Sequence, residues 1–266
     1  MTPETIKTCC ADLYASDWAR LLLGESFHPG ALALTERLGQ LLGLGPDSRV
    51  LDVASGPGTS ALFLARRFGC QVVGVDYSAR NVELARPTDR VQFVQADAEH
   101  LVTFDDATFD AVVCECAFCT FPDKPAAARE IARVLRPGGR FGLADLTRSG
   151  PLPPELDGLL AWLACVRDAL PIHGYVQHLQ SAGLRVEQVE AHDEALSELV
   201  RQIRARLLGA EVLSKLQQID LPGADFAQAK ALARCAADAV ERGVLGYSLI
   251  LASKPIAVSS PPRVSQ

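Results

Sequence analysis

The sequence predicts an α/β fold in which a mostly parallel, doubly wound sheet is covered by helices on both faces. From Arg49 onward, short β-branched apolar runs alternate with helical stretches of about a dozen residues, the pattern of βαβ units. A glycine-rich turn follows the first apolar run, in Val50-Leu-Asp-Val-Ala-Ser-Gly-Pro-Gly-Thr59. Acidic residues then stand at the ends of three consecutive runs, at Asp52, Asp76 and Asp97.

Composition limits the class of protein. With 266 residues and 48% hydrophobic residues, the chain can build one α/β domain of ordinary size with a smaller appendage. The net charge of −6 comes without a long run of Lys or Arg, so nucleic acid is not expected as a partner. No apolar run has the length of a signal peptide or a membrane span, which predicts a soluble cytoplasmic protein. A monomer or dimer that acts on a small molecule is expected.

The amino-terminal 45 residues have helical patterns and precede the sheet. Residues 16–24 begin with a cap-like Ser and end with Gly, and leucines follow helical spacing from Leu32 to Leu42 before Gly43. We expect this segment to form a helical lid beside the glycine turn.

The expected strands and helices of the sheet region follow in alternation. Strands are predicted at 50–53, 71–75, 91–95, 110–114 and 140–143, and helices at 59–68, 78–86 and 124–135. Pro137-Gly-Gly139 is expected to end the last of these helices before the fifth strand begins.

The carboxy-terminal half is predicted to be mostly helical. Helical segments are expected at 155–170 and 173–182, a strand at 184–190, a helical region at 193–242 that is broken at 221–223, and a strand at 246–252. The expected division is a lid at 1–45, a core at 46–192, a helical insertion or substrate cap at 193–242, the final core strand at 243–256 and a disordered tail at 257–266.

The glycine turn is a candidate ligand site. A turn of this kind between a strand and a helix exposes backbone N–H groups and admits a ligand where a Cβ would intrude. It departs from the Gly-x-Gly-x-x-Gly dinucleotide motif, because Ala54 and Ala61 occupy the first and third glycine positions. An ordinary tight turn therefore remains an alternative, whereas a nicotinamide enzyme is disfavoured by the missing third glycine and by the absence of a dehydrogenase-like catalytic Lys or Tyr motif.

The two later acids favour a nucleoside ligand. Asp76 ends the second predicted strand, where a carboxylate can bind both hydroxyls of a ribose. Asp97 follows the third strand, where it can bind the exocyclic amine of adenine. A helix cap or a solvated strand end is the alternative for each acid alone, but three acids at consecutive strand ends favour a shared site.

Residues 48–145 resemble the core of class I S-adenosylmethionine-dependent methyltransferases. The matching segments are the glycine turn, Gly74-Val-Asp-Tyr-Ser78, Ala96-Asp-Ala98 and Arg133-Val-Leu-Arg-Pro-Gly-Gly139. The resemblance implies a Rossmann-like, seven-stranded sheet with an antiparallel last strand, and S-adenosylmethionine as cofactor. It further implies three sets of contacts: Asp52, Ser55, Gly56 and Gly58 around the methionine moiety, Asp76 and Tyr77 at the ribose, and Asp97 and Ala98 at the adenine.

Eight cysteines are many for a chain predicted to be cytosolic. Three of them, Cys114, Cys116 and Cys119, follow the fourth predicted strand and so reach the edge of the sheet where ligands bind. If extended geometry continues, Cys114 and Cys116 point to one side and Glu115 to the other. Buried structural cysteines are the alternative for this cluster, and the simplest interpretation of Cys70 and Cys235.

A closer resemblance is to the arsenite methyltransferase family. It rests on Lys7-Thr-Cys-Cys10, on Cys116 followed by Pro122-Asp-Lys124, and on Cys165 ahead of Ala169-Leu-Pro-Ile172. The resemblance implies thiolates that hold trivalent arsenic beside the methyl sulfonium. Carried over by position, one of Cys9 and Cys10 would be the amino-terminal thiol and Cys165 a substrate-binding thiol. With the cluster after the fourth strand, the candidate thiols of the reaction are Cys9, Cys10, Cys116, Cys119 and Cys165, and the candidate metalloid ligands are Cys10, Cys114, Cys116, Cys119 and Cys165. The chain departs from the family because it has no Cys between Cys165 and Cys235, and because Cys114 and Cys119 are additional.

The leading hypothesis is therefore methyl transfer from S-adenosylmethionine to trivalent arsenic or a related thiophilic metalloid, with a thiol reductant. Arsenic bound by sulfur keeps a lone pair and needs no general base, which agrees with five histidines that lack paired spacing. Glu115 is expected to orient the cofactor ammonium or a substrate, with a solvated loop carboxylate as the alternative. The competing hypotheses are a small-molecule C-, O- or N-methyltransferase of the ubiquinone-biosynthesis type and a cysteine-based metal sensor on this scaffold.

Overall fold

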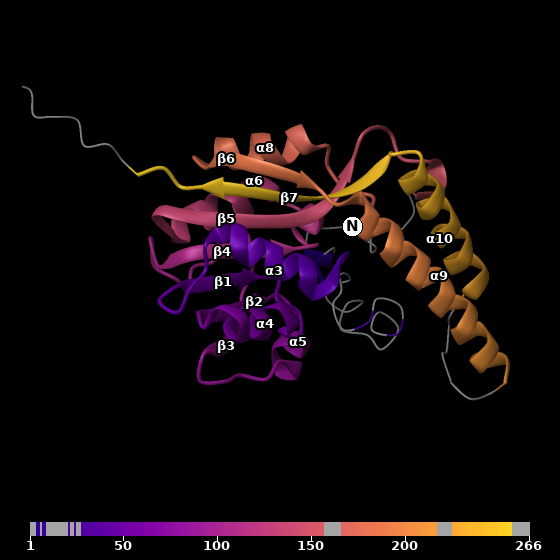
Figure 1. Ribbon diagram of the computed structural model, residues 1–266, viewed down its shortest axis with the longest axis horizontal. Helices are drawn as coiled ribbons and strands as arrows, with labels where there is room; N and C mark the ends of the chain where they lie inside the picture. Colours follow the sequence, from indigo (N-terminus) through magenta and orange to yellow (C-terminus); the bar gives the residue numbers. More distant parts are fainter. Residues whose placement is uncertain are drawn as a thin grey trace, which may run out of the picture.

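The computed structural model describes residues 4, 5, 7, 8, 21, 24, 28–156, 166–216 and 225–256. These residues build a seven-stranded sheet of order β3-β2-β1-β4-β5-β7-β6, which confirms the predicted fold class (Figure 1). The strands are β1 Arg49–Val53, β2 Gln71–Asp76, β3 Val91–Gln95, β4 Phe109–Glu115, β5 Leu135–Arg148, β6 Arg185–Ala191 and β7 Leu245–Ser253. β1 to β5 are parallel, and β7 is antiparallel to both β5 and β6, as expected for the last strand.

The strand order reverses between β1 and β4, and this reversal places the helices. The connection from β1 to β2 runs through α4 (Thr59–Phe68) toward one edge of the sheet, whereas α6 (Lys124–Val134) connects β4 to β5 toward the other. Because parallel crossovers are right-handed, the two helices cover opposite faces. The loops after β1 and β4 diverge at this point, which is where open α/β sheets bind ligands.

The remaining helices complete the two layers. α3 (Ala31–Leu42) lies beside α4 and packs leucines onto the sheet at Gly142, where a Cβ would come within 2.8 Å of Leu38. α8 (Ile172–Ser181) lies beside α6. α5 (Ala79–Leu84) begins at Ser78, whose hydroxyl accepts a hydrogen bond from the Asn81 N–H in the usual manner of an N-cap.

Several predicted boundaries were wrong in informative ways. The chain passes from α6 directly into β5 at Leu135, so the strand includes Pro137-Gly-Gly139 and is much longer than the predicted 140–143. The predicted helix at 155–170 is a 3-10 turn at Pro154–Leu156 in its first described part, and residues 166–170 are not helical. The predicted amino-terminal helix at 16–24, the break at 221–223 and the tail at 257–266 lie wholly or almost wholly outside the described residues.

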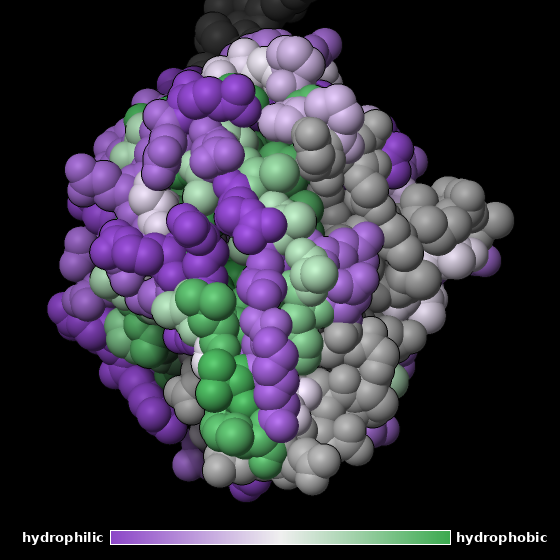
Figure 2. All heavy atoms as spheres, turned by 90° about the vertical axis from the view of Figure 1, so that its right-hand side faces the viewer, coloured by the Kyte–Doolittle hydropathy of each residue, from purple (hydrophilic) through white to green (hydrophobic). Residues whose placement is uncertain are grey.

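α9 (Asp193–Lys215) and α10 (Phe226–Glu241) form an antiparallel pair that extends beyond the sheet (Figure 1). Figure 2 looks onto this end of the molecule and shows hydrophobic side chains running beside hydrophilic ones. Four exposed large apolar side chains lie on or directly after α9: Leu208, Val212, Leu213 and Leu216. Of the helices in the described part of the chain, none combines the length and the apolar character of a membrane-spanning segment.

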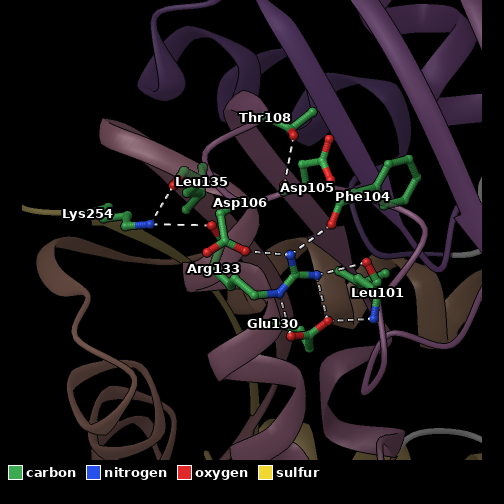
Figure 3. A network of polar contacts seen from close by, with 9 residues as sticks. All are labelled: Leu101, Phe104, Asp105, Asp106, Thr108, Glu130, Arg133, Leu135 and Lys254. Carbon is green, nitrogen blue, oxygen red and sulfur yellow. Dashed lines mark hydrogen bonds and ion pairs between the residues drawn. The ribbon is translucent and has the colours of Figure 1, made fainter.

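Arg133 on α6 joins the segment between β3 and β4 to the rest of the sheet (Figure 3). Its guanidinium donates hydrogen bonds to both carboxylate oxygens of Glu130 at 2.8 and 2.9 Å, and to Asp106 at 2.9 Å. It also donates to the backbone carbonyls of Leu101 and Phe104, each at 2.8 Å. The arginine of the sequence motif therefore has a structural task remote from the glycine turn.

Candidate active site

A pocket opens at the carboxyl ends of β1, β2 and β4, at the point where the strand order reverses. We call it the strand-end pocket; the loops after β1, β2, β3 and β4 line it, together with Lys7 and His28. Six of the predicted cofactor residues with side chains longer than Ala line it, on the ends of the strands or in the loops that follow them: Asp52, Ser55, Asp76, Tyr77, Asp97 and Glu115. Gly56 and Ala98 line it as well, whereas Gly58 does not and faces the ring of Phe93 instead.

The glycine turn takes its shape from three residues in the left-handed region. Gly56 and Gly58 have φ of 54° and 90°, and Ala54 has φ of 59° although it carries a Cβ. A Cβ on Gly58 would lie 2.3 Å from the ring of Phe93 on β3, so this glycine permits close packing of the loop onto the sheet. A Cβ on Gly56 would meet nothing within 4 Å, which leaves open space on the pocket side of the loop.

Asp76 holds the turn in place and keeps capacity for a ligand. Its carboxylate accepts hydrogen bonds from the N–H groups of Gly56 and Ser78, both at 2.8 Å, and from the amide of Asn81 at 3.1 Å. A carboxylate offers about four lone-pair positions, so one remains for a hydroxyl in the pocket. Burial raises the pKa of Asp76, and the three donors oppose that rise.

Asp52 and Ser55 present unsatisfied polar atoms at the same place. Asp52 is 2% exposed, and neither its Oδ2 atom nor the Ser55 hydroxyl has a hydrogen-bond partner among the described residues. Burial raises the pKa of Asp52 well above its usual value, and the nearby charges of Glu115 and Asp76 add to this rise. A buried anion surrounded by like charges is costly unless a cation compensates it. The pocket is therefore suited to a positively charged ligand with hydrogen-bond donors.

Lys7 covers the Asp97 end of the pocket. Its ammonium lies 2.6 Å from the Asp97 carboxylate and 2.5 Å from that of Glu99, and 5.8 Å from the centre of the Tyr77 ring. Burial disfavours ionised Asp97, but the hydrogen bond and charge of Lys7 outweigh this effect and lower the pKa of Asp97. The predicted adenine residue thus lies in the pocket, paired with a residue of the amino-terminal segment.

Glu115 leads a buried polar cluster at the opposite side of the pocket. Its side chain is only 4% exposed, so the alternative of a solvated loop carboxylate is wrong. The Thr35 hydroxyl on α3 lies 3.0 and 3.2 Å from the two carboxylate oxygens of Glu115. The Nε2 atom of His28, which is also buried, lies 3.4 Å from the Thr35 hydroxyl and 3.7 Å from Glu115.

The structure does not bring Cys114, Cys116 and Cys119 together. β4 ends at Glu115, and Cys116 turns into the left-handed region with φ of 53°, so the expectation of continued extended geometry is wrong. Cys116 lines the strand-end pocket, whereas Cys114 and Cys119 are fully buried in the core. Burial raises the pKa of Cys114 well above that of a free thiol, and the charges of Asp145 and Asp52 add to it.

The other predicted thiols divide in two groups. Cys9, Cys10 and Cys165 lie outside the described residues. Cys70 is buried, as predicted, and burial raises its pKa to about 11, while Cys235 on α10 is half-buried. Within the described part of the chain, three potential metal-binding side chains converge at Asp97, Glu99 and His100, where Lys7 already supplies positive charge to two of them.

Three polar residues near the site were missed by the sequence analysis: His28, Thr35 and Tyr247. The hydroxyl of Tyr247 on β7 is fully buried and has no partner among the described residues. None of these residues belongs to a motif with fixed spacing, since they come from the segment before α3, from α3 itself and from the last strand. The one available signal was an isolated Tyr at the start of a strongly apolar strand.

Comparisons with known proteins identify the class of protein to which this fold belongs. A family model described as a methyltransferase domain matches residues 51–143. The 27-O-demethylrifamycin SV methyltransferase of Amycolatopsis mediterranei (strain S699) is 32% identical over 272 residues, which cover 92% of this chain and 94% of that protein.

Solved structures agree at the level of the fold. The chain is similar to phosphoethanolamine N-methyltransferase 2 of Haemonchus contortus in complex with S-adenosyl-L-methionine, with a TM-score of 0.75, 20% identity and coverage of 92% of this chain and 57% of that one. It is also similar to the [4+2]-cyclase SpnF, with a TM-score of 0.74, 21% identity and 97% of both chains covered.

The chain belongs to the class I S-adenosylmethionine-dependent methyltransferases. It is a methyltransferase of the type that acts on small molecules, and the related proteins act on varied substrates. The likeness to a cyclase illustrates that this fold alone does not determine the reaction, so the acceptor must be argued from the site.

Proposed function

We propose that the strand-end pocket binds S-adenosylmethionine and transfers its methyl group to a small molecule beside Glu115 and Cys116. The observation that carries this proposal is the unpaired acidic charge of the pocket, above all the Asp52 Oδ2 atom, which has no partner among the described residues. The cofactor carries a sulfonium and an ammonium, so its charge complements that of the pocket. The Ser55 hydroxyl and the open backbone of Gly56 supply further contacts.

Each end of the pocket has its own task in this proposal. Asp52 and Ser55 hold the amino-acid part, the remaining lone pair of Asp76 accepts a ribose hydroxyl beside Tyr77, and Asp97 with Ala98 contacts the adenine. When bound, the cofactor supplies an electrophilic methyl group. The protein's contribution is to hold the acceptor in line with that group and to exclude water, a positioning effect worth about 7–11 kcal/mol at most.

Asp76→Asn is expected to weaken the binding of S-adenosylmethionine about tenfold or more. The variant keeps the size of the side chain but replaces one acceptor oxygen of Asp76 by an NH2 donor. A donor there cannot accept from a ribose hydroxyl, and it faces N–H groups that donate to the carboxylate in the wild type. Isothermal titration calorimetry measures the change, with Asp89→Asn on the exposed loop before β3 as the matched control. Equal affinity of the two variants would contradict the assignment of Asp76.

A trivalent metalloid is a second candidate acceptor, and the position of Cys116 favours it. Among the thiols in the described ranges, Cys116 is the one that lines the strand-end pocket. A soft thiolate is the ligand that such a centre selects. In this candidate function Cys9, Cys10 and Cys165 would complete the ligand set, and a thiol reductant would restore the trivalent state.

Cys116→Ser distinguishes this candidate from an organic acceptor. If a metalloid is the acceptor, the variant is expected to lower the rate of methylarsenite methylation about tenfold or more, because oxygen is a poor ligand for a soft centre. Cys235→Ser, which lies on α10 away from the pocket, is the control. Unchanged methylation of methylarsenite by Cys116→Ser, or none by the wild type, would rule out a metalloid held by Cys116.

A further inference from the structure

The cluster of Glu115, Thr35 and His28 is arranged to take up a proton from the strand-end pocket. The Nδ1 atom of His28 lies 3.2 Å from the carbonyl oxygen of Pro29, which can only accept, so Nδ1 carries a hydrogen. Nε2 then faces the Thr35 hydroxyl and Glu115. These partners determine the tautomer of neutral His28, with its hydrogen on Nδ1.

The Thr35 hydroxyl has one proton and two possible acceptors. In the structure it donates to the Glu115 carboxylate, whose other lone pairs can accept from a donor in the pocket. Once Glu115 has taken up a proton, the hydroxyl can turn, accept from Glu115 and donate to Nε2 of a neutral His28. The two arrangements differ by one added proton and by the direction of the Thr35 hydroxyl. Both His28 and Glu115 line the pocket, so the cluster is open to a ligand.

Tyr247 on β7 lies on the same face of the sheet as this cluster. The side chain of Tyr247 points to the face that carries Glu115 and α3, because side chains alternate along paired strands. Its hydroxyl is fully buried and lacks a partner among the described residues. Burial raises the pKa of Tyr247 well above its usual value, and the charges of Cys116, Glu115 and Asp145 add to this rise, so the hydroxyl remains a donor at neutral pH.

We propose that the acceptor is a hydroxyl compound, whose proton Glu115 accepts and passes through Thr35 to His28, while the Tyr247 hydroxyl helps to position the acceptor. This inference rests on the proposed methyltransferase function and specifies its substrate class. A soft acceptor with a free lone pair needs no proton acceptor, and a buried histidine–threonine–carboxylate chain would have no task in its methylation. An alcohol or phenol must lose its proton as the new bond forms.

The reaction balances without a further reagent. The acceptor oxygen forms a bond to the methyl carbon as the bond from that carbon to the sulfonium sulfur breaks, and the sulfur keeps the electron pair. The proton of the acceptor moves to a Glu115 oxygen, the proton of Glu115 moves to the Thr35 oxygen, and the Thr35 proton moves to Nε2 of His28. The products are the methyl ether, S-adenosylhomocysteine and a protonated His28, which releases its proton to solvent after product leaves.

The test is methyl transfer from labelled S-adenosylmethionine to phenol, catechol, 1,4-naphthohydroquinone, cyclohexanol and methylarsenite by the full chain. We expect the wild type to methylate at least one hydroxyl acceptor, and Glu115→Gln to lower kcat for it about 100-fold or more, the range for loss of a general base. Tyr247→Phe is expected to raise KM more than it lowers kcat. Glu83→Gln, an exposed glutamate on α5, is the control.

Two substitutions at Thr35 separate proton transfer from packing. Thr35→Val keeps the shape but removes the hydroxyl and is expected to lower kcat about tenfold or more, whereas Thr35→Ser restores the hydroxyl and recovers most of the activity. Transfer to methylarsenite alone, no transfer to any hydroxyl acceptor by a protein that binds the cofactor, or a Glu115→Gln variant as active as the wild type overturns the inference. Failure of the wild type to bind S-adenosylmethionine in calorimetry would instead overturn the proposed function.

Discussion

Asp52→Asn is expected to weaken the binding of S-adenosylmethionine about 10- to 100-fold and at the same time to stabilise the ligand-free protein. The Asp52 carboxylate is 2% exposed, and its Oδ2 atom has no partner in the described ranges. A cationic ligand gains from this charge, and the expected 10- to 100-fold loss corresponds to about 1.4–2.7 kcal/mol, the low end of the range for losing a buried charged partner. Without the ligand, the same charge opposes folding. Its removal is therefore expected to raise Tm by about 2–4 °C for each kcal/mol gained in the free energy of unfolding.

The pH dependence of this stabilisation has a defined sign. Burial, and then the charges of Glu115 and Asp76, raise the pKa of Asp52 in the folded state above the ordinary value of 3.8. The folded protein therefore binds more protons than the unfolded chain between the two pKa values, and its stability falls as pH rises through that range. The advantage of Asp52→Asn over the wild type should vanish as pH falls toward 3.8, grow as pH rises above that value and level off above the raised pKa of the folded state.

Thermal unfolding between pH 4 and 8 measures this difference, and Asp47→Asn at an exposed position before β1 is the matched control. Two results would contradict the account of Asp52. One is a variant that binds S-adenosylmethionine as tightly as the wild type. The other is a variant that is less stable than the wild type at neutral pH, because then the carboxylate would have a favourable partner in the folded protein.

Arg133→Met is expected to lower the free energy of unfolding by about 3–4 kcal/mol, since breaking a partly buried ion pair leaves its partner uncompensated. The substitution removes donors to Glu130, to Asp106 and to two backbone carbonyls in the segment before β4 (Figure 3). Burial of unpaired carbonyl groups adds to the loss. The hydrogen bond from the Leu101 N–H to Glu130, at 2.7 Å, and those from the N–H groups of Ala107 and Thr108 to the end of α6 remain, so the loss is expected to loosen the segment and not to detach it.

Urea unfolding measures the loss, and Arg129→Met on the exposed side of the same helix is the control, expected to change stability by less than about 0.5 kcal/mol. Arg133→Lys keeps the charge but not the planar fork, so an intermediate loss is expected. If Arg133→Met and Arg129→Met lose equally little, the network does not stabilise the fold.

The positions of the acids show how much of the site the sequence could predict. Parallel strands bring their carboxyl ends to one edge of the sheet, so Asp52, Asp76 and Asp97 were expected together, and the structure places all three around one pocket. Apolar runs of strand length likewise predicted all seven strands, and for β1, β2 and β4 burial on both faces of the sheet imposes that pattern.

The remainder of the site depends on tertiary contacts that have no sequence spacing. His28 and Thr35 meet Glu115 only because α3 packs on β5, the neighbour of β4, and Tyr247 joins their face because β7 returns antiparallel beside β5. The cysteines show the converse. Their spacing predicted a cluster on one side of a strand, but the left-handed turn at Cys116 separates it from the buried Cys114. A single backbone angle thus decides which thiol faces the pocket.

A crystal structure of the chain with S-adenosylhomocysteine tests the central claim most directly. We expect a ribose hydroxyl on Asp76, the amino-acid part against Asp52 and Ser55, and the sulfur directed toward Glu115 and Cys116. An acceptor site between the sulfur and the Glu115–Thr35–His28 cluster should then be visible. A nucleoside bound outside the strand-end pocket, or bound inside it with its sulfur directed away from Glu115, would contradict the account.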